Sequence, residues 1–162
     1  MCIRDWLTDA ARGLDLPALA AGGFSLVVLL PVPVWALARF VKEALPASPG
    51  LAACLFADEG AAAYAALGCT FRFSTAKLKP DTVHAHTPAW RAALWGVAEG
   101  LRGGTQGDPR WMGGAWVVDG AAGAARWAHK DEFNADQVPI ATLLAAAGAP
   151  EGAYAHHARP SA

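Results

Sequence analysis

The chain has 162 residues, of which 54% are hydrophobic, so it suits one domain with a sizeable core. Thirteen basic and fourteen acidic residues leave a net charge of -1, and no stretch clusters Lys and Arg, which excludes a nucleic-acid binder. Three cysteines without regular spacing argue against a disulfide framework and a metal site, and favour a reducing intracellular compartment or a reactive thiol.

The first predicted element is an amphipathic helix that begins almost at the first residue. Ile3, Leu7 and Leu14 fall at helical spacing. Gly13 and Pro17 then break or bend this helix.

The stretch from Leu16 to Ala38 carries no charged residue and is long enough to cross a bilayer. Several proline and glycine residues divide this stretch into short pieces and therefore argue against a membrane span. They are Pro17, Gly22, Gly23, Pro31 and Pro33. Such punctuation is typical of the short elements of a soluble α/β domain, so we predict no membrane span.

Two short strands and two helices are predicted next. Phe24 to Leu30 is a nearly continuous apolar run, which predicts a strand buried on both faces of a parallel sheet. A helix follows, predicted by the apolar residues Val34, Leu37, Ala38, Val41 and Leu45. Cys54 to Ala57 is the second predicted strand, and Gly60 to Leu67 is a short Ala-rich helix.

Residues 71–104 are predicted to be an insertion. Thr87 and Pro88 suit the start of a helix within it. We expect this helix to lie on the sheet or at its edge, through an apolar face made by Trp90, Leu94, Val97 and Leu101.

A hairpin and a last helix complete the domain. Alternation over Ala115 to Val118, a glycine turn and a second run over Ala125 to His129 predict two antiparallel strands. Val138 to Ala147 is the last predicted helix. Residues 149–162 are polar and contain proline, so we expect a flexible tail after one domain that covers residues 1–148.

The order of motifs late in the chain identifies a family. Gln106-Gly-Asp-Pro, then Gly113-Gly114, the hairpin, and His129-Lys130-Asp131 resemble the peroxiredoxin-like 2 proteins of the AhpC/TSA antioxidant family. Asp58, Tyr64 and Ala66-Leu-Gly68 also match that family, and Arg4 looks like the start of the helix that follows its redox site. The resemblance covers Arg4 to about Gly148.

The resemblance implies an α/β fold, a thioredoxin-like three-layer sandwich with a mixed sheet and a helical insertion. Such a sheet has a strand immediately before the first helix, and this chain has no residues for it, so we expect an incomplete N-terminus. The strand at Phe24 to Leu30 would then have an open edge, through which the chain is expected to self-associate.

Cys2 is the candidate nucleophile. The family carries a Cys-x-x-Cys pair at the start of the first helix, where unpaired amide groups lower a thiol pKa. This chain begins Met1-Cys2-Ile3-Arg4, so Ile3 stands where the family has its second cysteine, and Cys2 lies one position earlier. The alternative is an incidental thiol on a frayed terminus.

The rim of the redox site is assigned to Arg4, Asp108, Arg110, Gly113 and Gly114. The resemblance implies that the turn at Asp108 approaches the first helix, and the alternative is an Asx-type turn. The two glycines stand where peroxiredoxins would have a peroxide-polarising arginine, and they would let the backbone pass close to the thiol or substrate. Arg110 lies a few residues away, with a solvated loop residue as the alternative.

The remaining cysteines and histidines are given structural roles. Cys54 is assigned to the core. Cys69 would serve as a resolving thiol only if it lay near Cys2. His84 and His86 are assigned as ordinary loop residues, so no metal or other cofactor is expected. His129 is expected to orient its loop or to pair with Asp131.

The resemblance thus implies a peroxiredoxin-like, thiol-dependent antioxidant or thiol-disulfide oxidoreductase. It would take a peroxide or disulfide as substrate and a thiol reductant, thioredoxin or glutathione, as partner. The alternative is a non-catalytic thioredoxin-like interaction module that has lost the redox pair.

Overall fold

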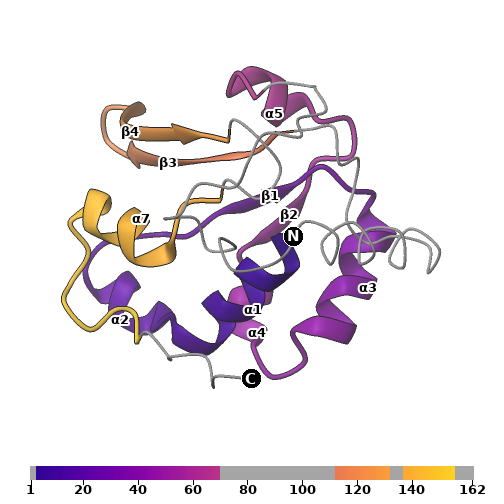
Figure 1. Ribbon diagram of the computed structural model, residues 1–162, viewed down its shortest axis with the longest axis horizontal. Helices are drawn as coiled ribbons and strands as arrows, with labels where there is room; N and C mark the ends of the chain where they lie inside the picture. The colour runs from indigo at the N-terminus through magenta and orange to yellow at the C-terminus, as the bar shows by residue number, and fades with distance from the viewer. Residues whose placement is uncertain (1–2, 70–111, 132–136, 156–162) are drawn as a thin grey trace, which may run out of the picture.

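The computed structural model describes residues 3–69, 112–131 and 137–155, without the side chains of residues 3–5. The predicted insertion, residues 71–104, lies outside the described residues. The elements in chain order are α1 (Ile3–Gly13), α2 (Leu16–Ala21), β1 (Val28–Leu30), α3 (Val34–Ala44), α4 (Pro49–Ala52), β2 (Leu55–Ala57), α5 (Ala62–Ala66), β3 (Gly114–Asp119), β4 (Ala124–Lys130) and α7 (Ile140–Ala147) (Figure 1).

The stretch without charged residues, from Leu16 to Ala38, contains α2, β1 and the first half of α3. No helix among the described residues has both the length and the hydropathy that crossing a membrane would require.

The strands form a parallel pair and an antiparallel pair. β1 pairs with β2, with Val28 opposite Leu55, and α3 makes the crossover between them. β3 pairs antiparallel with β4. The predicted α/β class and hairpin are confirmed. Within the described residues the pairs are two separate sheets rather than one mixed sheet, because neither β1 nor β3 has a second partner strand there.

The predicted strand at Phe24 to Leu30 is wrong in its first half, because β1 begins only at Val28. Residues before it close α2: Gly23 takes a φ of +81°, and the Phe24 N–H donates to the Leu19 carbonyl (2.9 Å). Val27 is 61% exposed, so the run is not buried on both faces. An apolar run of this kind carries no signal for where the helix cap stops and the strand starts.

The core lies between α1, α3 and α7 and the parallel pair of strands (Figure 1). Its buried members are Trp6, Leu7, Ala10, Val28, Leu30, Val32, Ala36, Phe40, Leu45, Leu51, Leu55 and Ile140. The Trp6 indole Nε1–H also donates to the Val138 carbonyl (2.9 Å), which ties the first turns of α1 to the segment before α7. The apolar stripe predicted for the first helix thus makes the contact that holds α1 in place.

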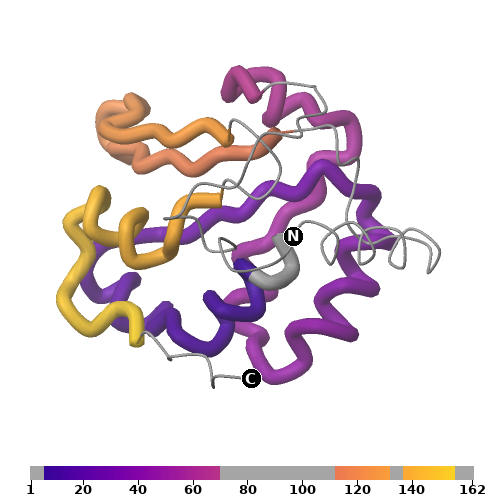
Figure 2. The backbone as a smooth tube through the Cα atoms, viewed as in Figure 1, coloured from indigo at the N-terminus to yellow at the C-terminus, as the bar shows by residue number. Residues whose placement is uncertain are grey.

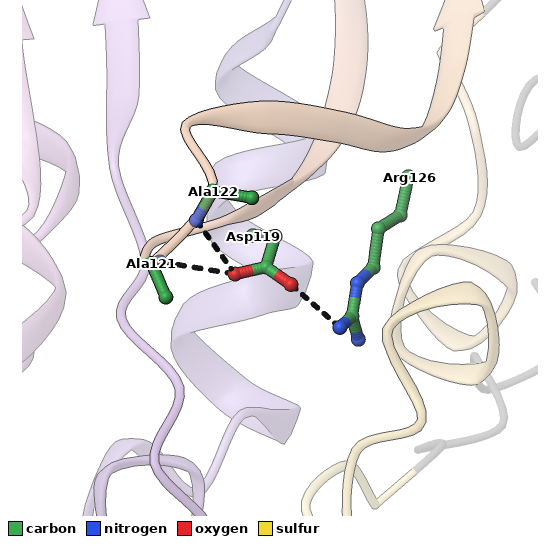
Figure 3. Close-up of polar contacts among 4 residues, drawn as sticks. All are labelled: Asp119, Ala121, Ala122 and Arg126. Atoms are coloured by element: carbon green, nitrogen blue, oxygen red, sulfur yellow. Dashed lines mark hydrogen bonds and ion pairs between the residues drawn. The ribbon is translucent and has the colours of Figure 1, made fainter.

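The turn of the hairpin is fixed by Asp119 (Figure 3). Its Oδ1 accepts from the N–H groups of Ala121 (2.9 Å) and Ala122 (3.1 Å), and its Oδ2 lies 2.6 Å from Nη2 of Arg126. The hydrogen bonds from these backbone N–H groups, that of Ala122 first, lower the pKa of the Asp119 carboxyl. The carboxylate therefore supplies turn chemistry that the glycine pattern alone did not reveal.

Residues 153–155 pack against the turn between α1 and α2, so the predicted tail begins too early. Ala153 is 1% exposed, its carbonyl accepts from Asp15, and the Ala155 N–H donates to the Gly13 carbonyl. The end of the tube in Figure 2 lies beside this turn. A Cβ at Gly13 would stand 2.4 Å from the Tyr154 ring, so this glycine makes the docking possible. Residues 156–162 lie outside the described residues.

We expect Tyr154→Phe to lower the free energy of unfolding by about 1 kcal/mol at neutral pH. The Tyr154 hydroxyl donates to Asp9 Oδ2 (2.8 Å), and burial followed by this hydrogen bond raises its pKa to about 12. Since the unfolded value is about 10, this raised pKa stabilises the fold below about pH 10 and the gain is lost as pH rises further. Melting temperatures of both proteins should converge above about pH 10, and a constant gap would contradict the assignment.

Candidate functional site

The structure describes only part of the predicted site. Cys2, Asp108 and Arg110 lie outside the described residues. Arg4 lies in the first turn of α1, but its side chain is not described. Gly113 and Gly114 are described, and the site is built outward from them.

The glycine pair lies where β3, β4 and α5 approach one another. The Asp131 N–H donates to the Gly113 carbonyl (3.1 Å). A Cβ on Gly113 would stand 3.1 Å from Asp131 Oδ2 and 4.0 Å from the Tyr64 hydroxyl. Among the described residues, Gly113 thus lies close to a carboxylate and a phenol. The approach to the thiol or substrate that was expected at the two glycines stays a prediction, because Cys2 lies outside the described residues.

Asp131 ends the hairpin as a buried carboxylate. It is 8% exposed, and its Oδ1 lies 3.5 Å from His129 Nε2. The pairing predicted for these two residues is therefore confirmed. The His129 ring also stacks on Trp127 with their centroids 6.4 Å apart, which orients the imidazole on β4.

Asp58 and Tyr64, the two residues that match the family's aspartate and tyrosine, hold α5 beside the parallel strands. Asp58 accepts from the N–H of Ala62 through Oδ1 (2.9 Å) and from the N–H of Tyr64 through Oδ2 (3.1 Å), so it caps α5. The Tyr64 hydroxyl donates to the Leu29 carbonyl (3.1 Å). The match at these two positions thus reflects how α5 is anchored beside β1.

We expect Asp58→Ala to lower the free energy of unfolding by about 1 kcal/mol, because two amide groups at the start of α5 lose their acceptor. Asp58→Asn keeps one carbonyl oxygen and should retain part of that stability. Urea unfolding of the two variants measures the difference. Equal loss in both would mean that the charge, rather than the cap, is what matters.

Cys69 belongs to the same group of side chains. Its N–H donates to the Tyr64 carbonyl (2.9 Å), and the residue is half-buried. Burial, followed by the negative charge of Asp131, raises the pKa of the Cys69 thiol, while the positive charge of Lys130 opposes the rise. Burial likewise raises the Tyr64 pKa, with Cys69 and Asp131 adding to it. We call Tyr64, Cys69, Lys130 and Asp131 the Cys69 cluster.

The Cys69 cluster was not predicted from the sequence. The Leu-Gly motif that ends at Gly68 and the His129-Lys130-Asp131 motif lie far apart in the chain. The only available signal was that both belong to one family pattern, and nothing local shows that they meet in space.

Cys54 lies outside this cluster. It precedes β2 rather than beginning the strand, it is half-buried, and its Sγ–H donates to the Gly50 carbonyl (3.3 Å). The core position predicted for Cys54 is therefore wrong, because the residue is only half-buried and β2 starts one residue after it. Burial alone raises the pKa of the Cys54 thiol.

The described part of the chain contains no group of three His, Cys, Asp or Glu side chains that could hold a metal ion. His84 and His86 lie outside it.

Comparison with known proteins gives one match. The family model described as AhpC/TSA antioxidant enzyme matches residues 14–132, more than half of the chain. No curated protein and no solved structure gave a significant match. The matched part includes Asp58, Tyr64, the glycine pair and Asp131, and it begins after Cys2.

Proposed function

The chain belongs to the AhpC/TSA antioxidant enzyme family, and from this premise we propose that it is a thiol-dependent antioxidant that acts through Cys2. The family match over residues 14–132 carries the proposal. Family membership supports a thioredoxin-like redox role. The choice between peroxide reduction and thiol-disulfide exchange, and the use of Cys2, go beyond it.

The position of Cys2 in the sequence supports the assignment. Cys2 immediately precedes α1, which begins at Ile3 and runs for 11 residues. The first amide N–H groups of a helix have no partner within it and favour a negative charge, so a thiol at this position ionises more readily. The thiolate is the form that attacks a peroxide.

The reaction needs only the thiol, the peroxide and a reductant. The Cys2 thiolate attacks one peroxide oxygen, an S–O bond forms, the O–O bond breaks, and the leaving oxygen takes up a proton as water or an alcohol. Cys2 is then a sulfenic acid. A reductant thiol attacks its sulfur and expels water to give a mixed disulfide, and a second thiol releases the Cys2 thiol and leaves the reductant as its disulfide.

Alkylation of Cys2 by a haloacetamide across pH tests this proposal. A midpoint well below about 8.5, the value of a free thiol, supports it, and a midpoint near that value removes it. Cys2→Ser should lose hydrogen peroxide consumption, whereas Cys54→Ser, a matched change outside α1, should keep it. Peptide mapping by mass spectrometry assigns the alkylation to each cysteine.

A second candidate is a non-catalytic thioredoxin-like interaction module. Its supporting observation is that the matched residues around Asp131 and Tyr64 serve to anchor backbone and helix, as their hydrogen bonds show. A Cys2→Ser variant that keeps every measurable activity would favour this candidate.

A substrate, a reductant and a second copy of the chain are the partners that we propose. A peroxide or disulfide substrate and a thiol reductant are the partners that the redox proposal requires. Self-association is proposed through a sheet edge, because neither β1 nor β3 has a second partner strand in the described residues. Sedimentation across protein concentration tests it, and a constant monomer mass would rule it out.

A further inference from the structure

Residues 150–155 run back along α2 after α7 has ended. Pro150 lies beside the end of α2, where a Cβ at Gly22 would stand 2.9 Å from its Cγ. At the start of α2, the Asp15 N–H donates to the Ala153 carbonyl (2.9 Å). We call residues 150–155 the C-terminal strap, and the end of the tube in Figure 2 shows its course.

The strap also binds the end of α1. Tyr154 pairs with Leu14 in an antiparallel bridge, and the Ala155 N–H donates to the Gly13 carbonyl (2.9 Å). The Tyr154 hydroxyl reaches the second half of α1, where it donates to Asp9 Oδ2 (2.8 Å). The strap therefore connects the end of α1 to the start of α2.

Gly13 is required by the strap rather than by α1. It is the last residue of α1 and its φ is not positive, so the helix itself tolerates a side chain there. A Cβ would stand 2.4 Å from the Tyr154 ring and 2.7 Å from the Ala155 carbonyl oxygen. Alanine at this position would favour the helix by its propensity but would displace the strap.

α2 and the strap are attached only to the edge of the core cluster. α2 has six residues, too few for a stable isolated helix. Its buried side chain, Leu19, and the buried Ala153 of the strap are not members of the core cluster. The side chains of this region that pack against the cluster are only partly buried, and they are Leu14, Leu16 and Tyr154. Separation of α2 and the strap from the domain therefore exposes less apolar surface than separation of α1 would.

A glycine of positive φ lies at the end of each of the two segments. Gly23 follows α2 with a φ of +81°, and Gly148 follows α7 with a φ of +70°. A Cβ at either glycine would meet no described atom within 4 Å, so the backbone can rotate there without a clash. The Ala149 N–H donates to the Leu144 carbonyl (3.0 Å), so α7 is closed before the strap begins. The strap can therefore leave α1 while α7 stays folded.

We propose that α2 and the C-terminal strap open together as one unit, hinged at Gly23 and Gly148, while α1, α3 and the parallel strands stay folded. Such an opening is a local unfolding equilibrium with a lower free energy than global unfolding. It breaks the hydrogen bond from Tyr154 to Asp9 and the main-chain bonds of the strap, so the strap determines how often α2 opens. The strap binds the end of α1 and Cys2 precedes its start, so the proposal is independent of the redox chemistry.

Hydrogen–deuterium exchange of the full chain, followed peptide by peptide with mass spectrometry, tests the proposal. The amides of α2 and of the strap should exchange together, and well before those of β1. Tyr154→Phe should accelerate exchange in both segments by the same factor, about fivefold, because both depend on the lost hydrogen bond. Gly13→Ala should accelerate it more, by about tenfold, despite the higher helix propensity of alanine.

Tyr64→Phe is the matched control, because it also removes one tyrosine hydrogen bond, to the Leu29 carbonyl (3.1 Å), but outside the proposed unit. It should accelerate exchange in α5 and β1 and leave the rates of α2 and the strap unchanged. Faster exchange of α2 in this variant would mean that α2 opens only when the whole domain unfolds, which would overturn the proposal. Unchanged exchange of α2 in Tyr154→Phe, or slower exchange in Gly13→Ala, would overturn it as well, because the strap would then not hold α2.

Discussion

Leu7→Ala is expected to lower the free energy of unfolding by about 3 kcal/mol. Leu7 is 0% exposed and lies in the cluster that joins α1 to the parallel strands and α7. Truncation removes the transfer free energy of the buried side chain and leaves a cavity that the neighbours fill only in part. Urea unfolding with an unchanged slope measures the loss.

Val27→Ala is the matched control for this prediction. Val27 is 61% exposed, so its truncation should change the unfolding free energy by less than about 0.5 kcal/mol. Similar losses in both variants would mean that α1 is not held by its apolar face. Since α1 follows Cys2 directly, the Leu7 variant should also lose part of any activity that depends on the start of this helix.

The elements that the sequence predicted well are those with local signals. The hairpin was predicted because strand alternation and a glycine turn lie within about 20 residues of each other, and their pairing needs no distant partner. The first helix was predicted from its apolar spacing, which the burial of Leu7 and Ala10 confirms.

The errors arise where distant segments meet. Residues 153–155 were assigned to a tail because their composition is that of a tail, yet Tyr154 bonds to Asp9, 145 positions earlier. The structural role given to Cys69, because buried cysteines usually have one, stays a prediction, and the sequence alone does not show that Lys130 and Asp131 influence the pKa of its thiol. Composition and spacing report local preference, and contacts of this kind depend on the closed fold.

The family motifs and the candidate nucleophile also rest on different kinds of support. Asp58 and Tyr64 hold α5 against β1, and Gly113 admits Asp131 beside it, so the matched residues explain how the scaffold is built. The redox chemistry that we propose depends on Cys2, which precedes the matched part. Experiments on Cys2 and on the scaffold therefore answer separate questions.

Gly114→Ala is expected to lower the free energy of unfolding by about 2 kcal/mol. Its Cβ would stand 2.5 Å from the His129 carbonyl oxygen and 2.6 Å from Cη2 of Trp116. The Trp116 ring can turn away, but the carbonyl belongs to the paired strand β4, so relief requires the two strands to separate at the end where Asp131 follows. Urea unfolding gives the loss, and near-ultraviolet circular dichroism of the tryptophans reports the local change.

Gly113→Ala is the matched control for Gly114→Ala. Its Cβ would stand 3.1 Å from Asp131 Oδ2, a side-chain atom that can shift by a few tenths of an ångström, so the cost should be less than about 1 kcal/mol. That shift should move the Asp131 charge and alter the alkylation rate of Cys69 relative to Cys54. A larger loss in Gly113→Ala than in Gly114→Ala would contradict the backbone clash as the reason for the second glycine.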